Sequence, residues 1–599
     1  MIFPKLQEVS RYRNMTSVFG GYNHQISCQE GQFFDMKNLT SKYFPVLSPR
    51  NERGIVKRFT NPQGILDKED IWWIDDKCLY KNGERIYLDD VSFTDDSPKT
   101  LAKMGAYIIV MPDRVWINTA KGEDHPEHGY MEHTYEVKNG TPSVTFALAN
   151  AYGAAIEYHD AEYYEKNTPK DGDYLMSVTN EGKPSLKVYS ASTSIWMSVA
   201  SPYMQIRSRG IGLGFEKEDG IKITCNTNRG LENVLINKED SNWTTNTYIM
   251  DKTDDSITIP GIFSADVQEI QGEINLTVER KVPDLAYITE CNNRLWGCSK
   301  DGHEVYCSKL GDVKNWNCFR GIATDSWAAT IGSDGKFTGA VTYLGYPMFF
   351  KEDGLVKIAV SATGAHQTKE TKCRGVQDGS NGSLVILNEN LYYKSTTSVC
   401  VYNGSLPTSI SAEFGDVNYY DATAGAFGDN YYISMRDAKG VYSIFVYDSK
   451  NGIWCKEDDT RAVQFLKYKD DLYYVDGKDN TMKSVGGTLL YDVPEKDTEG
   501  NVEWFAESGV IGYTSPDNKY VGRINLRITL EFGTNVDFFL QYDSCGEWEH
   551  KFNMSGTGTR TFSVPIIPRR CDHFRYKISG RGGCKIHSIT KTIEGGSEY

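Results

Sequence analysis

Short runs of apolar and aromatic residues alternate along the chain with tight polar turns, many of which contain Asn-Gly or Asp-Gly. Asn and Gly tolerate the positive φ that a two-residue hairpin turn needs, and such a turn matches the twist of the flanking strands. Hairpins that recur at blade-like intervals predict a β-propeller. The pattern is clearest in residues 79–87, 344–358, 391–404 and 472–477.

Two stretches carry this hairpin pattern, and a stretch of different texture separates them. Residues 61–120 predict the first propeller blades, and residues 285–500 predict the remaining blades. Residues 121–284 contain strand-like runs but also long polar segments. We interpret them as an inserted β-rich domain, because insertions are tolerated at loop tips.

The two ends of the chain differ from the propeller and from each other. Residues 1–60 predict an N-terminal extended segment for assembly across a neighbouring domain or subunit, because two prolines within residues 43–50 disfavour a helix. Residues 501–599 include runs such as 523–530, in which polar and apolar residues alternate strictly. This period predicts half-buried antiparallel strands and a C-terminal β-sandwich. The predicted fold class is all-β: a β-propeller with an inserted β-rich domain and a C-terminal β-sandwich.

Composition agrees with this fold and narrows the classes of function. The 599 residues include 38 Tyr and 55 Gly, which favour strands and turns. The formal charge of −15 argues against wrapping of nucleic acid by counterion release. Solubility is the simplest interpretation of the charge. The more specific alternative is a channel with an acidic lining, through which a polyanion slides without sticking.

Targeting segments and a disulfide framework are not expected. The first residues lack the apolar region of a secretory signal, and no run approaches the roughly 18 apolar residues of a membrane-spanning helix. The 13 Cys residues are scattered and form no C-x-x-C pair. Reduced thiols in a protein made in the cytosol fit this usage better.

One segment has the residue types of a metal site. Residues 124–133 contain three histidines and two glutamates, whose imidazole and carboxylate groups suit Zn²⁺. The spacing matches no metalloenzyme motif, and Pro126 opposes a helix there, so a solvated loop is the preferred interpretation. The candidate metal ligands are His125, His128 and His133, with Glu127 and Glu132 beside them.

Motifs of enzymes are missing from the sequence. It contains neither a phosphate-binding loop nor a nucleophile elbow, and we interpret residues 333–338 as a hairpin turn. A glycosidase needs two carboxyl groups about 5–9 Å apart, and the sequence alone identifies no such pair. We therefore predict that the chain is not an enzyme and has neither catalytic residues nor a cofactor.

A local basic cluster stands out in the acidic chain. Residues 568–578 include Arg569 and Arg570 close to Asp572. The preferred interpretation is a structural ion-pair network in which one of these arginines braces Asp572, or a subunit contact, rather than a ligand site.

Residues 293–296, 304–308, 311–316 and 338–358 together resemble tail nozzle proteins of short-tailed bacteriophages, also called tail tubular B or packaged-DNA stabilisation proteins. The resemblance covers mainly residues 285–360. It implies a homohexameric ring of β-propeller subunits below a dodecameric adaptor, with double-stranded DNA passing through the lumen without sequence-specific binding. The implied partners are the adaptor or head-tail connector and tail fibre or tail-tip proteins. The implied location is the tail of a virion made in the cytoplasm of a host bacterium.

Two classes of function follow from these observations. The first is a structural virion protein, a tail nozzle ring that retains and channels packaged DNA. The alternative is a receptor- or carbohydrate-binding tail protein that could also cleave glycans, in which Trp504 or Trp548 could stack on a sugar, although a core role is preferred for both. A tail-tip or baseplate scaffold is a third possibility within the structural class.

Overall fold

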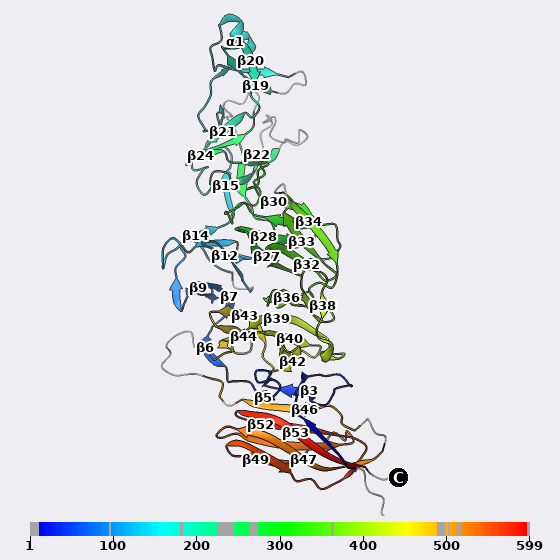
Figure 1. The fold of residues 1–599 in the computed structure, drawn as a ribbon. Helices are drawn as coiled ribbons and strands as arrows, with labels where there is room; N and C mark the ends of the chain where they lie inside the picture. Colours follow the sequence, from blue (N-terminus) through cyan, green and yellow to red (C-terminus); the bar gives the residue numbers. More distant parts are fainter. Residues whose placement is uncertain are drawn as a thin grey trace, which may run out of the picture. The chain divides into compact units, whose positions relative to one another are not determined.

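The computed structural model describes residues 11–94, 98–179, 184–225, 243–262, 274–360, 365–487, 498–500, 502–512 and 517–595. Strands dominate it (Figure 1). Within the described residues the helical segments are α1 (Ala161–Lys166) and the 3₁₀ turns η1 (Asn381–Ser383) and η2 (Ala412–Phe414). No helix in this part of the chain has the length and apolar character needed to cross a membrane. The all-β prediction is confirmed.

Seven four-stranded antiparallel sheets among the described residues have the strand order of propeller blades. Six are meanders of consecutive strands, and the seventh takes its outer strand from the N-terminal part of the chain. The sheets are β7 (Pro62–Lys68), β8 (Asp70–Asp75), β9 (Cys78–Lys81) and β10 (Glu84–Ile86); β11 (Thr100–Met104), β12 (Tyr107–Met111), β13 (Val115–Asn118) and β14 (Glu127–Tyr130); β27 (Leu285–Cys291), β28 (Arg294–Ser299), β29 (Glu304–Cys307) and β30 (Trp327–Thr330); β31 (Gly339–Tyr343), β32 (Tyr346–Lys351), β33 (Gly354–Val360) and β34 (His366–Lys372); β35 (Val385–Leu387), β36 (Asn390–Lys394), β37 (Val399–Tyr402) and β38 (Thr408–Ser409); β39 (Tyr419–Phe427), β40 (Asn430–Asp437), β41 (Tyr442–Asp448) and β42 (Ile453–Lys456); and β43 (Ala462–Tyr468), β44 (Asp471–Asp476), β45 (Thr481–Ser484) and β6 (Gly54–Arg58).

The chain divides into two compact units. The first contains Met1–Glu84, Phe349–Leu355 and Thr371–Tyr599, and the second contains Arg85–Met348 and Val356–Glu370. In the first unit, the antiparallel pairing of β6 with β45 ties the N-terminal part of the chain to the last blade. This closing strand lies inside the range 1–60, for which the sequence predicts an extended segment.

The sandwich also lies in the first unit and consists of two sheets. Its inner face follows the predicted alternation, because Ile524, Leu526 and Ile528 of one strand are all fully buried. One sheet has the order β1 (Arg11–Thr16), β53 (Cys584–Gly595), β47 (Lys519–Leu530) and β50 (Gly558–Val564), with β51 (Arg570–Cys571) also paired to β47. The other has the order β2 (Gly21–Tyr22), β3 (Gln32–Lys37), β46 (Glu503–Ser508), β52 (Phe574–Arg581), β48 (Asn535–Tyr542) and β49 (Glu549–Ser555).

The N-terminal strands belong to this sandwich. The sequence instead predicts an extended segment that lies across a neighbouring domain or subunit. β1 pairs with β53 along its whole length, and β3 pairs with β46. Both pairings satisfy backbone groups at strand edges that the C-terminal strands alone would leave open. A two-stranded sheet of β4 (Leu39–Thr40) and β5 (Ser48–Pro49) follows. Residues 1–10 of the predicted segment lie outside the described residues.

The range predicted as an insertion lies in the second unit and forms three sheets of its own. β14 lies beyond the predicted blade boundary at residue 120, since it pairs with β13. A core that includes Ile206, Ile223 and Leu186 joins all three sheets. The sheets are β15 (His133–Val137), β26 (Leu276–Arg280), β22 (Gly220–Cys225) and β23 (Trp243–Tyr248); β16 (Thr145–Ala149), β21 (Tyr203–Arg207), β25 (Ser256–Pro260) and β24 (Asp251–Thr253); and β17 (Tyr158–His159), β18 (Tyr174–Val178), β19 (Pro184–Ser190) and β20 (Ile195–Ser198).

Candidate functional site

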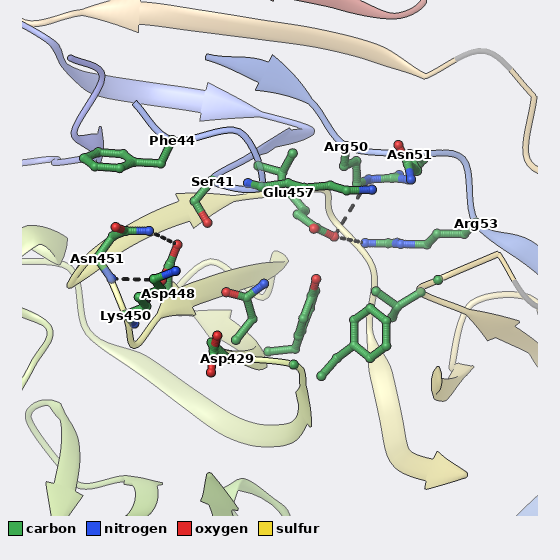
Figure 2. Close-up of a pocket in the computed structure, with 18 residues that line it drawn as sticks. Ser41, Phe44, Arg50, Asn51, Arg53, Asp429, Asp448, Lys450, Asn451 and Glu457 are labelled. Atoms are coloured by element: carbon green, nitrogen blue, oxygen red, sulfur yellow. Dashed lines mark hydrogen bonds and ion pairs between the residues drawn. The ribbon is translucent and has the colours of Figure 1, made fainter. Parts of the chain in front are cut away.

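A cavity of about 510 Å³ lies in the first unit, between the segment 40–53 and the hairpin turns of the β39–β42 blade (Figure 2). We call residues 40–53 the crossover and this space the crossover cavity. It is lined by Thr40, Ser41, Lys42, Phe44, Arg50, Asn51, Arg53, Phe427, Gly428, Asp429, Asn430, Tyr432, Asp448, Lys450, Asn451, Glu457, Val485 and Gly486.

Backbone hydrogen bonds hold the crossover against the propeller. The N–H of Asn38 donates to the carbonyl of Glu457 at 3.0 Å, and the N–H of Arg50 donates to the carbonyl of Asn38 at 2.9 Å. Asn38 itself has a φ of 56°, a conformation that Asn tolerates better than most residues. One wall of the cavity is therefore fixed in place before any side chain is considered.

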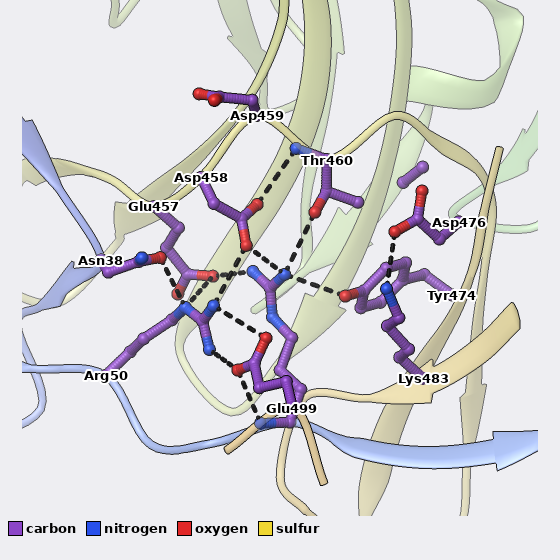
Figure 3. Close-up of polar contacts among 12 residues, drawn as sticks. Asn38, Arg50, Glu457, Asp458, Asp459, Thr460, Tyr474, Asp476, Lys483 and Glu499 are labelled. Carbon is purple, nitrogen blue, oxygen red and sulfur yellow. Dashed lines mark hydrogen bonds and ion pairs between the residues drawn. The ribbon is translucent and has the colours of Figure 1, made fainter. Parts of the chain in front are cut away.

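A buried ion network lies behind this wall (Figure 3). Arg53 donates through Nη1 to Asp458 at 2.7 Å and to the hydroxyl of Tyr474 at 2.9 Å, and its Nη2 contacts Glu457. Arg50 donates to Asp458 at 3.1 Å and to Glu499 at 3.2 Å. Two guanidinium groups thus meet three carboxylates that come from two distant parts of the sequence.

The network sets the charge of its buried members. Burial alone would raise the pKa of Asp458, but Arg53 and Arg50 hold it well below its usual range. Burial would likewise lower the pKa of Arg53, and the charge of Asp458 raises it instead. Since both arginines are already neutralised by carboxylates, the network presents no excess of positive charge to the cavity.

One polar atom of the network is left over. The side chain of Arg53 is only 2% exposed, and its Nε has no hydrogen-bond partner in the described part of the chain. Arg53 lines the crossover cavity. Because a buried donor without a partner is costly, this atom is an unsatisfied group in the wall of the cavity.

The opposite wall is made of hairpin turns with different roles. Asp448 accepts from the backbone N–H groups of Lys450 and Asn451 at 3.0 Å each, so its carboxylate holds the β41–β42 turn. Asp429, in the β39–β40 turn, is exposed and accepts from Asn388 Nδ2 at 3.0 Å through Oδ1. Its Oδ2 takes no hydrogen bond from the described residues and is free for a ligand.

Aromatic side chains complete the lining. Phe44 and Phe427 are half-buried, and Tyr432 is buried. The cavity thus combines flat apolar rings with carboxylate, amide and ammonium groups. Such a mixture suits a ligand that has both C–H faces and many hydroxyl groups.

The three histidines of the candidate metal set are not brought together. His128 has both ring nitrogens 2.7 Å from carbonyl oxygens, those of Pro126 and Asp89. The ring of His125 stacks on Tyr87. His133 packs edge-on against Phe215, and burial lowers its pKa. In the described ranges no group of three or more His, Cys, Asp or Glu residues could hold a metal ion, so the structure does not support this set as a metal site.

The two tryptophans proposed for sugar stacking have other surroundings. Trp504 is 2% exposed, and its Nε1 donates to the carbonyl of Gly582 at 3.2 Å, so it belongs to the sandwich core. Trp548 is half-buried beneath two cations, with Arg575 5.6 Å and Lys577 5.9 Å from the ring centroid. Both cations therefore lie against the ring on which a sugar would stack.

The basic cluster forms ion pairs, but with other partners than expected. Arg569 pairs with Glu549 at 3.1 Å, while Asp572 lies 2.8 Å from the Nδ1 of its neighbour His573. Asp572 is therefore engaged by its sequence neighbour, and Arg569 forms its ion pair with a residue of β49 instead.

Sequence reasoning missed the residues that form the crossover cavity and its network. Arg50 and Arg53 meet carboxylates about 400 residues away, at Glu457 and Asp458. The one local signal was the run of three acidic residues at 457–459, at the end of a blade in which apolar and aromatic residues dominate.

Comparison of the chain with protein-family models and with curated proteins finds no match. Among solved structures, the exo-beta-1,3-galactanase of Phanerochaete chrysosporium is 9% identical over 55% of this chain and 97% of its own, with a TM-score of 0.21. Hsv2 of Kluyvelomyces marxianus is 10% identical over 66% of this chain and 99% of its own, with a TM-score of 0.23. The Trypanosoma rangeli sialidase in complex with sialic acid is 9% identical over 71% of this chain and 94% of its own, with a TM-score of 0.20.

These comparisons correct one prediction. The prediction that the chain is not an enzyme is wrong, because two of the similar structures, a galactanase and a sialidase, are enzymes that act on glycans. A missing sequence motif is therefore no ground for excluding catalysis.

Proposed function

We propose that this protein binds carbohydrate in the crossover cavity. The observation that carries the proposal is the cavity itself, in which aromatic rings and hydroxyl-pairing groups line a space beside a buried arginine with an unpaired Nε. A volume of about 510 Å³ lies in the range of small-molecule sites.

The chemistry of the walls matches a sugar. Each sugar hydroxyl can donate one hydrogen bond and accept others, so it pairs with carboxylates, amides and ammonium groups alike. Asp429, Asn51 and Lys450 supply one of each kind, and all three are exposed. Phe44 and Phe427 supply apolar surface for the C–H face of a ring.

The charge of the site favours a neutral glycan. Arg50 and Arg53 would attract an anionic sugar only if their charges were free, and both are paired with Glu457, Asp458 and Glu499. The two lysines of the lining, Lys42 and Lys450, are offset by two carboxylates, Asp429 and Asp448. An uncharged oligosaccharide is therefore the proposed ligand class.

A glycan array probed with the purified chain tests this function. We expect binding to at least one neutral glycan and a loss of affinity of about tenfold or more in Asp429→Ala, because a charge-assisted hydrogen bond is removed. Asp470→Ala is the matched control, since Asp470 is exposed in the β43–β44 turn and does not line the cavity. No binding to any glycan, or equal loss in both variants, would overturn the proposal.

Whether the bound glycan is also cleaved is measured on the same material. A reducing-sugar assay with the strongest array ligand separates binding from hydrolysis. If cleavage occurs, Asp429→Ala should reduce it together with binding, whereas Asp470→Ala should leave both unchanged.

A further inference from the structure

A second cavity borders the same crossover. It has a volume of about 410 Å³ and lies in the first unit, against the β47–β48 and β52–β53 turns of the sandwich. Arg50 and Asn51 line both cavities. The two cavities are therefore neighbours along the crossover.

An aromatic side chain stands at the rim of the second cavity with almost no protein around it. Phe532, in the β47–β48 turn, is 95% exposed and lines the cavity. Both faces of this ring are open to solvent, so it offers an aromatic surface on which a ligand in the cavity can stack. Across the cavity, Lys585 covers the ring of Tyr43, with its Nζ 4.0 Å from the centroid, and leaves Phe532 as the open ring.

The floor of this cavity also contains an unpaired polar group. Ser48 lines it and is 2% exposed, and its hydroxyl has no partner in the described part of the chain. Beside it, Gly582 has a φ of 93°, and a Cβ at Gly583 would lie 2.2 Å from Glu531 Oε2. The positive φ favours glycine at 582, whereas at 583 the flexible Glu531 side chain would have to move.

We infer that the ligand of this protein is an extended oligosaccharide that runs over the crossover from the first cavity into the second, with a distal sugar stacked on Phe532. This inference rests on the proposed function and adds the length of the ligand and a second subsite. An oligosaccharide fits because both cavities combine polar groups with an aromatic ring, while Arg50 and Asn51 connect them. A monosaccharide would leave Phe532 and the Ser48 hydroxyl without contacts.

The test uses the full-length chain and linear oligomers of glucose, galactose and N-acetylglucosamine, from disaccharides to octasaccharides. For the series that binds, we expect affinity to rise with length, and Phe532→Ala to lower the affinity for the octasaccharide by about fivefold. The disaccharide should bind equally well to both proteins. Phe532→Trp should retain the gain with length, and Ile567→Ala is the control, because Ile567 is 87% exposed on the same sandwich but does not line the cavity.

Each other outcome decides against one idea or both. Binding that is lost in Asp429→Ala, but is independent of length and of Phe532, overturns the second subsite and leaves the proposed function standing. The absence of binding in every series overturns both. Mass photometry compares the wild-type chain with Phe532→Ala. If the wild type self-associates and the variant does not, the ring is a contact between copies and the inference is wrong.

Discussion

At the scale of single residues, the most constrained side chains of the site are charged ones. Arg53 and Glu457 are almost completely buried, with Asp458 beside them. Desolvation makes such a network expensive to form, and the loss of one member leaves the opposite charges uncompensated. The network therefore fixes the crossover in one position, which the cavity needs.

Replacing the central arginine tests this role. We expect Arg53→Met to lower the free energy of unfolding by about 3–5 kcal/mol, because Glu457 and Asp458 would remain buried without their counter-charge. Urea denaturation measures the change. Lys57→Met, on the exposed side of β6, is the control and should stay within about 0.5 kcal/mol of the wild type. A similar small effect for both variants would mean that the network does not hold the fold.

A second residue-scale prediction concerns pH. Lys394 is 3% exposed, and burial lowers its pKa to about 8. Between pH 8 and about 10.5 the unfolded chain therefore binds more protons at this position, so its contribution to stability rises with pH. We expect the stability of the wild type relative to Lys394→Met to increase by about 3 kcal/mol over this range. Chemical denaturation at a series of pH values measures it, and a difference independent of pH would contradict the prediction.

At the scale of elements, turns and strand faces follow the sequence closely, whereas pairings between distant strands do not. The Asn-Gly turn between β9 and β10 has φ values of 49° at Asn82 and 95° at Gly83, as the hairpin prediction requires. The partner of β6 is β45, more than 400 residues later. No local pattern encodes that pairing, because any strand with a free edge offers the same backbone groups.

Packing between neighbouring blades leads to the next prediction. A Cβ at Gly425 of β39 would lie 2.8 Å from both Leu472 and Phe465 of the following blade. Gly425→Ala should therefore destabilise the protein by about 1–3 kcal/mol through overpacking. Gly332→Ala is the matched control, because its nearest neighbour would be 3.8 Å away. Thermal unfolding compares the two variants. Equal transition temperatures would contradict the prediction, because they would show that the contact between the blades accommodates the added methyl group.

The loop that carries part of the resemblance has an architectural role in the second unit. Asn315 is buried, accepts from the N–H of Gly220 at 3.1 Å and donates to the carbonyl of Glu218 at 2.7 Å. Lys314 pairs with Glu216 at 2.7 Å. Residues 309–320 belong to the β27–β30 blade. They thus connect this blade to the start of β22, which is a strand of the inserted sheets.

At the scale of the whole molecule, the homohexameric ring implied by the resemblance is a prediction about assembly that one chain does not test. Six copies of a 67.5 kDa chain would have a mass of about 405 kDa. Mass photometry of the purified protein, alone and mixed with an adaptor protein of a short-tailed phage, measures this directly. A species of that mass would favour a ring, and a chain that stays monomeric in every mixture would rule it out.

The sequence by itself determined the fold class, the hairpin turns and the alternating faces of the C-terminal strands, because these depend on residues within a few positions of one another. Only the tertiary structure decided which strand closes the last blade, that β1 and β3 complete the sandwich, and that Arg50, Arg53, Glu457 and Asp458 meet beside a cavity. The physical reason is the same in each case. Backbone edges and charges pair with whatever the fold brings near, and the distance along the chain does not enter the energy of the contact.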